Sequence, residues 1–466
     1  MSWISRENHN KNNDGEKTYS FTRWMSWLFL VASILLLIYT YYKSEITLNG
    51  ARDVIYFKYY LISLTGILFW GVMLLLREGA RANIVTVVTS LVVGLYLVEG
   101  GLTFFGGFHL TRVSAATELG VEYDERSQLA VIEDLIAEGV DAVPTVHPSH
   151  LIGHSRVGKE SVHALLPLAG ISNKTTVGGN ENGKHMIYLS DRYGFNNPDS
   201  EWDSGEVDWL LIGDSFTHSA AVQPGQEIAG QLRSITGNST INLGIGGNGP
   251  LFEYAGLVEY GKALKPAQVL WVYFEGNDLK GDLQREKKSP LLMQYMKDGF
   301  SQKLINRQLE VDSRLGKYII LAQAQAQEHV RLYKTKWIRL YAIRAMLGFD
   351  VVDTDIDPLF AEILTKAKAE VDGWKGKLYF VYLPQYERYS NKGVSHDDFR
   401  RKSEVIEVVK GLGIPVVDIH QEVFADHLDP LALFPFRLSG HYNADGYSEV
   451  AKAIVISVNK YEQSNK

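Results

Sequence analysis

A serine follows directly where a strongly apolar run ends. Residues 207–212 read VDWLLI, the next five read GDSFT, and a helical pattern begins soon after. A serine at such a strand-to-helix turn exposes its hydroxyl at the carboxyl edge of a sheet, where open α/β sheets bind their ligands. Ser215 is therefore a candidate nucleophile for attack on a carbonyl carbon. The G-x-S-x-G pattern of lipases is not met, because Phe216 and Thr217 follow the serine.

Two further strand ends offer hydrogen-bond donors at the same edge. TINLGI (240–245) is followed by GGNG, and AQVLWVYF (267–274) is followed by EGND. The N–H groups of Ser215 and Gly247 and the side-chain amide of Asn277 would give three donors for one oxyanion. Acyl transfer requires such donors where tetrahedral charge develops, and losing one costs ~10²–10³ in rate. These three residues are the predicted oxyanion hole.

A histidine near the end of the sequence completes the set. SGHYN (439–443) precedes the last helical segment, 444–458, so His441 stands late in the chain, as the base does in α/β hydrolases. We predict that His441 is the general base for Ser215. His218 is a weaker candidate, because it is too near Ser215 in sequence to face it easily across the turn.

Each of these residues also has an ordinary structural explanation. Ser215 taken alone could cap a helix. Gly247 could be a plain turn glycine, and Asn277 a structural turn residue. The occurrence of four such groups at successive element ends favours the catalytic interpretation.

Short apolar runs alternate with amphipathic helical ones from residue 207 onward. Near-continuous apolar strands separated by helices are typical of a parallel sheet that is covered on both faces. The sequence therefore predicts an α/β fold with strands at 207–213, 240–245, 267–274, 377–383 and 414–419.

In these four blocks the chain resembles the SGNH (GDSL-like) hydrolases, whose blocks supply a serine, a glycine, an asparagine and a histidine. GDSFT, NLGIGGN, EGND and SGHYN stand in the family's order, within about 207–280 and 375–460. SDRYGFNNP (190–198) also resembles a segment that precedes the serine block in membrane-linked members near polysaccharide genes. The resemblance implies a flavodoxin-like three-layer α/β fold and an esterase or acyltransferase activity.

One position departs from the family's pattern. An Asp usually stands three residues before the histidine and orients its imidazole, whereas this sequence has Leu438. The orienting group of His441 could be a backbone carbonyl, Asp445 one turn later, or nothing. A Ser–His pair can still work, because the Asp mainly fixes the tautomer and stabilises the imidazolium. The change could also mark a non-catalytic assembly or binding protein.

The N-terminal part of the sequence has a different character. Residues 1–23 are polar, and we expect them to form a disordered cytoplasmic leader. Apolar stretches at 24–42, 59–76 and 84–105 each approach or reach the ~20 residues that span a bilayer. Three transmembrane helices are therefore expected within 24–105.

The remaining sequence is expected to divide into a connector, 106–200, and the hydrolase-like domain, 201–466. A mostly helical insertion at about 281–370 interrupts this domain. This insertion could form a cap over the substrate, or it could serve only for packing or as an oligomer contact. The sequence favours neither role. The basic run 285–288 is expected to be a solvated face.

Composition excludes several chemistries. The chain has no cysteine, which excludes disulfides, thiolate catalysis and Cys-ligated metal sites. A net charge of −7 without a basic face argues against a nucleic-acid partner. We expect neither metal nor cofactor, because the spacing of the histidines in the connector fits no established ligand pattern. These are His147, His150, His154 and His163.

The leading interpretation is a serine esterase that acts on O-acyl, and specifically O-acetyl, groups of an extracytoplasmic glycan. O-acyl transfer to a polysaccharide through the same site is the alternative within the enzyme class. The expected partners are an acylated carbohydrate or small ester, the lipid bilayer, and a membrane protein of a polysaccharide pathway.

The Lys and Arg residues near the apolar stretches predict the orientation of the chain in the inner (plasma) membrane. Six lie in the leader and second loop, and four in the first loop and after the third stretch. Because the side richer in Lys and Arg stays in the cytoplasm, the catalytic domain should lie outside it. A C-terminal alkaline phosphatase fusion should therefore be active. A fusion whose phosphatase remains in the cytoplasm would overturn the orientation.

Overall fold

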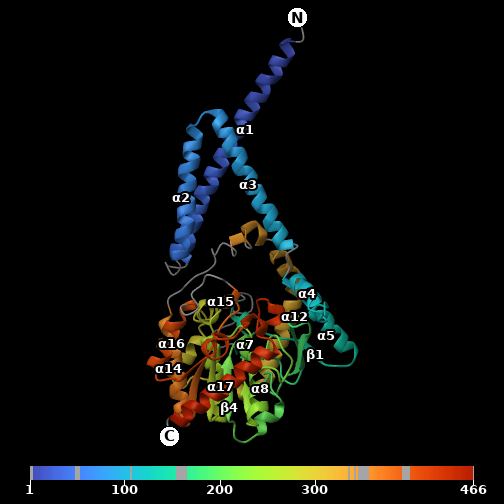
Figure 1. Ribbon diagram of the computed structural model, residues 1–466, viewed down its shortest axis with the longest axis vertical. Helices are drawn as coiled ribbons and strands as arrows, with labels where there is room; N and C mark the ends of the chain where they lie inside the picture. Colours follow the sequence, from blue (N-terminus) through green and yellow to red (C-terminus); the bar gives the residue numbers. More distant parts are fainter. Residues whose placement is uncertain are drawn as a thin grey trace. The chain divides into compact units, whose positions relative to one another are not determined.

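The computed structural model describes residues 4–47, 53–104, 108–153, 165–333, 336–340, 343–344, 356–390 and 399–464 (Figure 1). The chain divides into two compact units. The first contains Met1–Phe108 and Gln327–Thr354, and the second contains His109–Ala326 and Asp355–Lys466. All the candidate catalytic residues belong to the second unit.

Three long helices form most of the first unit: α1 (Ile4–Tyr41), α2 (Asp53–Leu75) and α3 (Glu78–Phe104). Three stretches are long and apolar enough to cross a membrane, namely Phe21–Ile46, Tyr56–Leu75 and Glu78–Leu102. Helix α1 already begins at Ile4, so the expectation of a disordered leader is wrong for residues 4–23. Once the apolar part of a helix has formed, each added residue gains a hydrogen bond without a new nucleation cost.

Part of the helical insertion packs against α3 within this first unit. The Tyr96 hydroxyl donates to the carbonyl of Ile338 at 3.0 Å, and the Tyr96 and Trp337 rings meet edge to face at 5.8 Å. The Ile343 N–H donates to Glu99 Oε2 at 2.9 Å. For this part of the insertion, packing is therefore the observed role.

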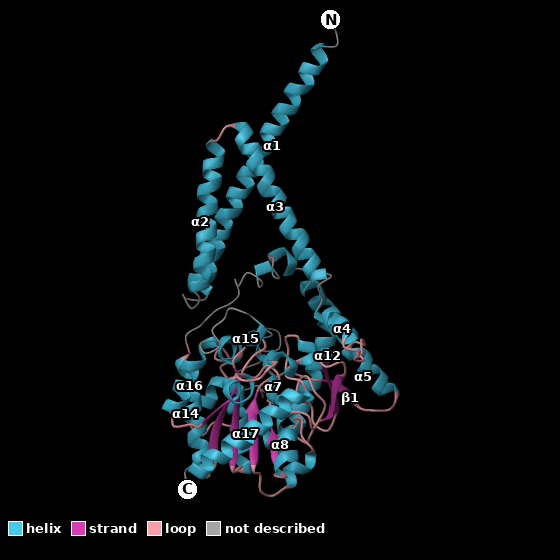
Figure 2. Ribbon diagram, viewed as in Figure 1, coloured by secondary structure: helices cyan, strands magenta, loops and turns pink. Residues whose placement is uncertain are grey.

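The second unit is built on a five-stranded parallel sheet with the order β5-β4-β6-β7-β8. Numbered along the α/β part, this order is 2-1-3-4-5, the flavodoxin-like arrangement. The strands coincide with the five predicted ones, and the predicted fold class is confirmed. They are drawn as arrows in Figure 2 and are β4 (Trp209–Gly213), β5 (Thr240–Asn242), β6 (Gln268–Phe274), β7 (Lys377–Leu383) and β8 (Val416–Asp418).

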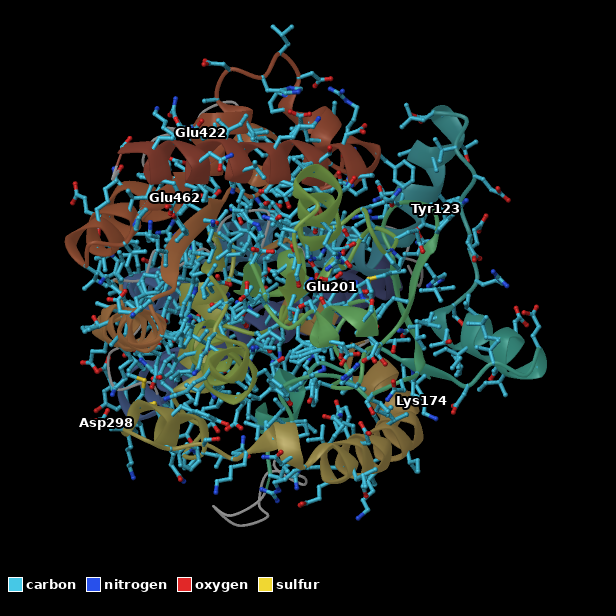
Figure 3. The ribbon with its side chains drawn as sticks, turned by 90° about the horizontal axis from the view of Figure 1, so that it is seen from below. Tyr123, Lys174, Glu201, Asp298, Glu422 and Glu462 are labelled. Atoms are coloured by element: carbon cyan, nitrogen blue, oxygen red, sulfur yellow. The ribbon has the colours of Figure 1, made fainter. Side chains whose placement is uncertain are left out.

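Helices cover both faces of this sheet. Alternate strand residues enter two separate apolar cores, with Leu210 in one and Leu211 in the other. The alternation follows from the two-residue period of a strand. One core includes α9 (Pro250–Gly256), α14 (Pro358–Gly373) and α16 (Lys402–Gly411), and the other includes α8 (Ile228–Thr236) and α17 (Ala444–Ser464). Glu462, labelled in Figure 3, accepts from Lys377 Nζ at 2.6 Å and so joins the end of α17 to the start of β7.

Residues 106–200, expected as a connector, contain regular structure. The described part of this range includes the helices α4 (Phe108–Glu118), α5 (Gln128–Ala137) and α6 (Ser149–Gly153) and a second sheet of β1 (Ala142–Pro144), β2 (Thr175–Asn180) and β3 (His185–Leu189). Strands β2 and β3 form an antiparallel hairpin. Its turn is closed by the Gly183 N–H, which donates to Asn180 Oδ1 at 2.8 Å, and Gly183 has φ +93°. The hydroxyl of Tyr123, labelled in Figure 3, donates to the Asn180 carbonyl at 3.1 Å.

A fully buried ion pair joins the loops that follow β6 and β7. Glu275 accepts from Nε and NH2 of Arg388, and both side chains have no exposed surface. The Tyr382 hydroxyl and the Gln385 N–H also donate to Glu275, so its oxygens are fully engaged. Loss of one partner would leave a buried charge without compensation.

We expect Arg388→Met to lower the free energy of unfolding by about 3–5 kcal/mol. Urea denaturation of the full chain, followed by tryptophan fluorescence, measures this. Arg307→Met is the control, because the Arg307–Glu310 pair is partly exposed on both sides, and its loss should cost less than about 1 kcal/mol. Equal losses in the two variants would contradict the assignment.

Candidate active site

The turn after β4 presents Ser215 without using its hydroxyl as a cap. The short helix α7 (Ser215–His218) begins here, and Asp214 caps it by accepting the Phe216 N–H at 2.8 Å. Gly213 is required at the strand end, because a Cβ there would lie 2.1 Å from Thr217 Oγ1. The alternative that Ser215 is itself the helix cap is therefore wrong.

Ser215, His441 and a third residue form a continuous chain of hydrogen bonds. His441 Nε2 is 2.8 Å from Ser215 Oγ, and His441 Nδ1 is 2.9 Å from Glu181 Oε1. The second oxygen of Glu181 accepts the backbone N–H of His441, also at 2.9 Å. A carboxylate on Nδ1 leaves Nε2 free to accept the serine proton, which is the arrangement of a Ser–His–acid triad.

Glu181 is the residue that the sequence analysis missed. It lies in the turn between β2 and β3, 260 positions before His441. The three expected options were a backbone carbonyl, Asp445 or no partner at all. None of them holds, because the side chain of Glu181 bonds His441 Nδ1. No local signal marks Glu181, because the family's acid is sought three residues before the histidine. Leu438 can occupy that place since the acid comes from another part of the fold.

The charges of the pair stabilise each other. Burial alone would raise the pKa of Glu181, but the attraction of His441, its hydrogen bonds and the charge of Arg112 outweigh this and lower the pKa to about 2. Burial would likewise lower the pKa of His441, yet Glu181 raises it above its ordinary value. Glu181 is thus ionised at neutral pH and stabilises the imidazolium form of His441.

A cavity of about 720 Å³ opens beside Ser215 and His441. Gly247 and Glu181 also line it, and α12 (Gln308–Tyr333) of the insertion supplies one wall. This part of the insertion therefore lines the cavity beside the candidate site. The apolar lining comes from both α5 and α12 and includes Leu129, Ile132, Tyr318, Ile319 and Ala322.

The predicted oxyanion donors are brought together only in part. Gly247 has φ +76°, and within the described part of the chain its N–H makes no hydrogen bond. Asn277 follows β6 as predicted, but it is not among the residues that line the cavity. Its Nδ2 donates to Asp282 Oδ2 at 2.6 Å. An amide nitrogen has two N–H groups, so one donor of Asn277 is committed to Asp282.

Arg285 joins these two loops, and its assignment to a solvated face is wrong. Its NH2 donates at 2.6 Å both to the carbonyl of Gly247 and to Asp282 Oδ1. The side chain is about one-third exposed, at 35%. A single guanidinium therefore connects the Gly247 loop with the carboxylate that holds Asn277.

The other histidines near the cavity have structural partners. His218 Nε2 is 3.0 Å from the Tyr188 hydroxyl, and burial lowers the pKa of His218 to about 3. A ring with so low a pKa binds a proton only weakly, and its Nε2 is already bonded to Tyr188, so His218 is a poor substitute for His441 as base. His147 Nδ1 lies 2.7 Å from the Gly246 carbonyl. Within the described part of the chain no group of three His, Cys, Asp or Glu residues is placed to hold a metal; His154 and His163 lie outside it.

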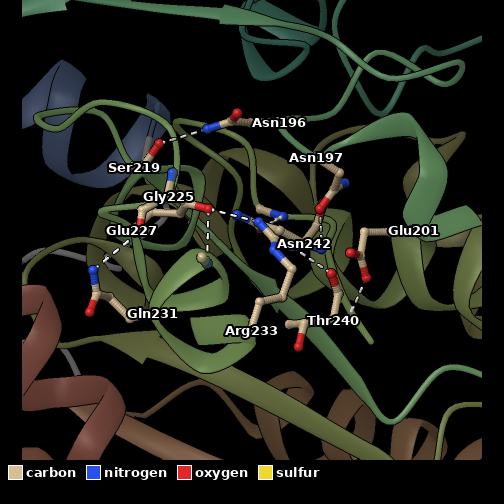
Figure 4. Close-up of polar contacts among 12 residues, drawn as sticks. Asn196, Asn197, Glu201, Ser219, Gly225, Glu227, Gln231, Arg233, Thr240 and Asn242 are labelled. Atoms are coloured by element: carbon tan, nitrogen blue, oxygen red, sulfur yellow. Dashed lines mark hydrogen bonds and ion pairs between the residues drawn. The ribbon is translucent and has the colours of Figure 1, made fainter. Parts of the chain in front are cut away.

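Buried asparagine side chains contact α7 and the residue that follows it (Figure 4). Asn242, at the end of β5, donates through Nδ2 to the Thr217 carbonyl at 2.7 Å. Asn197 pairs with the backbone of Asn242 in both directions, at 2.8 and 2.9 Å. Asn196 Nδ2 donates to Ser219 Oγ at 2.8 Å. The segment 190–198, singled out in the sequence, therefore holds α7 and the β5 loop together.

No family model and no curated protein sequence matches the chain. The likeness is to solved structures of esterases and lipolytic proteins. They include a G-D-S-L family protein from Desulfitobacterium hafniense (12% identity, 53% of this chain and 98% of that chain covered, TM-score 0.31) and a lipase/acylhydrolase from Enterococcus faecalis (13%, 55% and 96%, TM-score 0.32). An acetylxylan esterase from Geobacillus stearothermophilus matches with 15% identity, 54% and 94% coverage and a TM-score of 0.30.

Replacement of Glu181 by Gln should lower the pKa of His441. The substitution removes the negative charge that favours the imidazolium but keeps the size of the side chain. NMR titration of the histidine ring carbons in the solubilised full chain measures the effect. Asp445→Asn is the matched control and should leave the pKa of His441 unchanged. A pKa that responds to Asp445→Asn and not to Glu181→Gln would contradict the assignment.

Proposed function

We propose that this protein is a serine esterase that cleaves O-acyl esters, with Ser215 as nucleophile, His441 as general base and Glu181 as the orienting acid. The observation that carries the proposal is the unbroken hydrogen-bond chain from Ser215 Oγ through His441 to Glu181. The position at the carboxyl edge also supports it. The strand order reverses beside β4, and open α/β sheets bind their ligands at such a switch point.

The first half-reaction forms an acyl-enzyme. Ser215 Oγ attacks the ester carbonyl carbon while His441 Nε2 takes the hydroxyl proton. The resulting oxyanion accepts hydrogen bonds from the N–H groups of Ser215 and Gly247, and Asn277 is the proposed third donor. The C–O bond to the alcohol then breaks, and the imidazolium returns its proton to the leaving oxygen.

The second half-reaction decides between a hydrolase and a transferase. Water or a sugar hydroxyl attacks the acyl carbon, His441 takes its proton, and Ser215 Oγ leaves and is reprotonated by His441. Both reactions use the same residues, so the acceptor alone distinguishes them. Release of acetate from an acetyl ester, measured with and without an added glycan acceptor, separates the two.

An extracytoplasmic acylated glycan is the proposed substrate. Three helices that could span a membrane precede the α/β domain, and the distribution of Lys and Arg favours a domain outside the cytoplasm of the inner membrane. A lipid-linked or newly exported polysaccharide would meet the enzyme there. O-acetyl groups are the proposed acyl groups, and a membrane protein of a polysaccharide pathway is a proposed partner.

A non-catalytic binding protein is the candidate from another class. Leu438 favoured this interpretation, because a histidine without a carboxylate partner would be a poor base. Because Glu181 provides a carboxylate partner, Leu438 no longer favours a non-catalytic protein. A fluorophosphonate probe distinguishes the classes, since it labels only an activated serine. Failure of the folded protein to react would favour the binding protein.

Ser215→Ala should abolish fluorophosphonate labelling and reduce ester turnover by at least ~10³-fold. Ser234→Ala is the matched control, because Ser234 is exposed on α8 and outside the proposed machinery. It should retain wild-type labelling and turnover. Unchanged turnover in Ser215→Ala would refute the proposed function.

Glu181→Gln should lower kcat by up to ~10⁴-fold, the cost of losing a triad acid in a well-studied case. Asp445→Asn and Asp429→Asn should have small effects. Asp445 lies in the first turn of α17, and Asp429 pairs with Arg437. Steady-state kinetics on a chromogenic acetyl ester measure this order. A folded Asp445→Asn protein as impaired as Glu181→Gln would contradict it.

A further inference from the structure

A buried arginine contacts the elements that carry both members of the Glu181–His441 pair. Arg112 lies on α4, and 1% of its side chain is exposed. Its NH1 donates to the backbone carbonyl of Glu181, and its NH2 is 3.4 Å from Glu181 Oε2. The same NH2 donates to the carbonyl of Ser439 at 2.8 Å. One guanidinium thus joins the hairpin turn of the acid to the loop of the base.

The packing around this guanidinium leaves no space for adjustment. A Cβ at Gly440 would lie 2.4 Å from Arg112 NH2 and 2.6 Å from Glu181 Oε2. The backbone of Gly440, directly before His441, therefore packs against the Arg112–Glu181 ion pair. A planar guanidinium reaches several acceptors in a fixed geometry, whereas a lysine ammonium of similar reach cannot reproduce this fork.

The charge of Arg112 also affects the two ionisable groups. Burial raises the pKa of Glu181, whereas His441 and, to a smaller extent, the charge of Arg112 lower it. Arg112 opposes the effect of Glu181 on His441, because a positive charge disfavours the imidazolium. Arg112 therefore favours an ionised acid while limiting the rise in the pKa of the base, which must be neutral to accept a proton.

We propose that Arg112 is a positioning residue for the catalytic base, which it serves by fixing the acid and the histidine loop on one guanidinium. The inference rests on the proposed function, because it needs His441 to act as base. It also extends the catalytic unit beyond the four family blocks. Both Arg112 and Glu181 lie outside residues 201–466, so the segment that follows the third apolar helix in sequence becomes part of the active site.

The test compares Arg112→Gln and Arg112→Lys with Arg233→Gln in the full chain. Arg233 makes the same kind of contacts, with NH1 on the carbonyl of Thr240 at 2.6 Å and NH2 on Glu227 Oε1 at 3.1 Å (Figure 4). Thr240 begins β5, so these contacts lie at the amino edge of the sheet, opposite to Ser215. Arg233→Gln therefore reports the cost of losing an arginine clamp, here 16% exposed, away from the site.

Arg112→Gln should lower kcat by ~10–100-fold with little change in KM, because a displaced base acts in the reaction and not in substrate binding. Removal of the positive charge should raise the pKa of His441 and move the acid limb of kcat/KM to higher pH. Arg112→Lys should lose kcat while the limb stays in place. Arg233→Gln should reduce stability and leave kcat and the acid limb unchanged.

Either of two results of this kinetic comparison overturns the inference. One is an Arg112→Gln protein with wild-type kcat and pH profile, and the other is a pH profile that moves equally in Arg233→Gln. If Arg112→Gln does not fold, Gly440→Ala disturbs the same contact from the other side, and a wild-type kcat there is equally decisive against it. Wild-type turnover by Ser215→Ala would instead refute the proposed function. NMR titration of His441 would still test Arg112 in that case, since a pKa unmoved by Arg112→Gln overturns its role.

Discussion

The contact between Glu181 and His441 sets the requirement that the rest of the second unit meets. It joins residues 260 positions apart, so the layer that contains β2 and β3 must dock on the sheet closely enough for hydrogen bonds of 2.9 Å to form. Further bonds hold the hairpin in place: Asn182 Nδ2 donates to the carbonyl of Ala221 at 2.6 Å, and Gln223 Nε2 to that of His185 at 2.9 Å. Both join the hairpin to the loop after α7. The acid and the nucleophile are therefore positioned by one set of contacts.

The sequence predicted the elements that repeat a simple pattern and missed what depends on distant contacts. All five sheet strands follow from apolar runs, and Ser215, Gly247 and His441 follow from their places at element ends. Glu181 could not be found in this way, because an acidic residue in a polar hairpin turn looks like any solvated turn residue. Its role exists only when the second sheet docks. Arg285 was misread for the same reason, since a basic run carries no sign that one member bonds a distant carbonyl.

Leu438 at the expected place of the acid and the supply of the carboxylate by Glu181 have a common physical cause. A histidine base needs a partner for Nδ1, but the requirement is for a charge and a hydrogen bond, and it does not fix which element supplies them. Leu438 removes the local acid, and a hairpin outside the family blocks provides another. That solution requires a second support, because a carboxylate brought from a separate layer must be held in place and kept ionised. The guanidinium of Arg112 meets both needs at one point.

The proposed oxyanion side poses the opposite electrostatic problem, because buried carboxylates lie close to Asn277. A negative charge beside a developing oxyanion would oppose the reaction. Burial, and then the proximity of other carboxylates, raises the pKa of Glu253 and of Asp278 well above the ordinary range, which favours their neutral forms. Burial also raises the pKa of Asp282, to about 7, but Asp282 is in addition paired with Arg285, whose guanidinium also donates to the Gly247 carbonyl. The carboxylate that holds Asn277 is thus paired with a cation, so the amide is held without an uncompensated charge beside this proposed oxyanion donor.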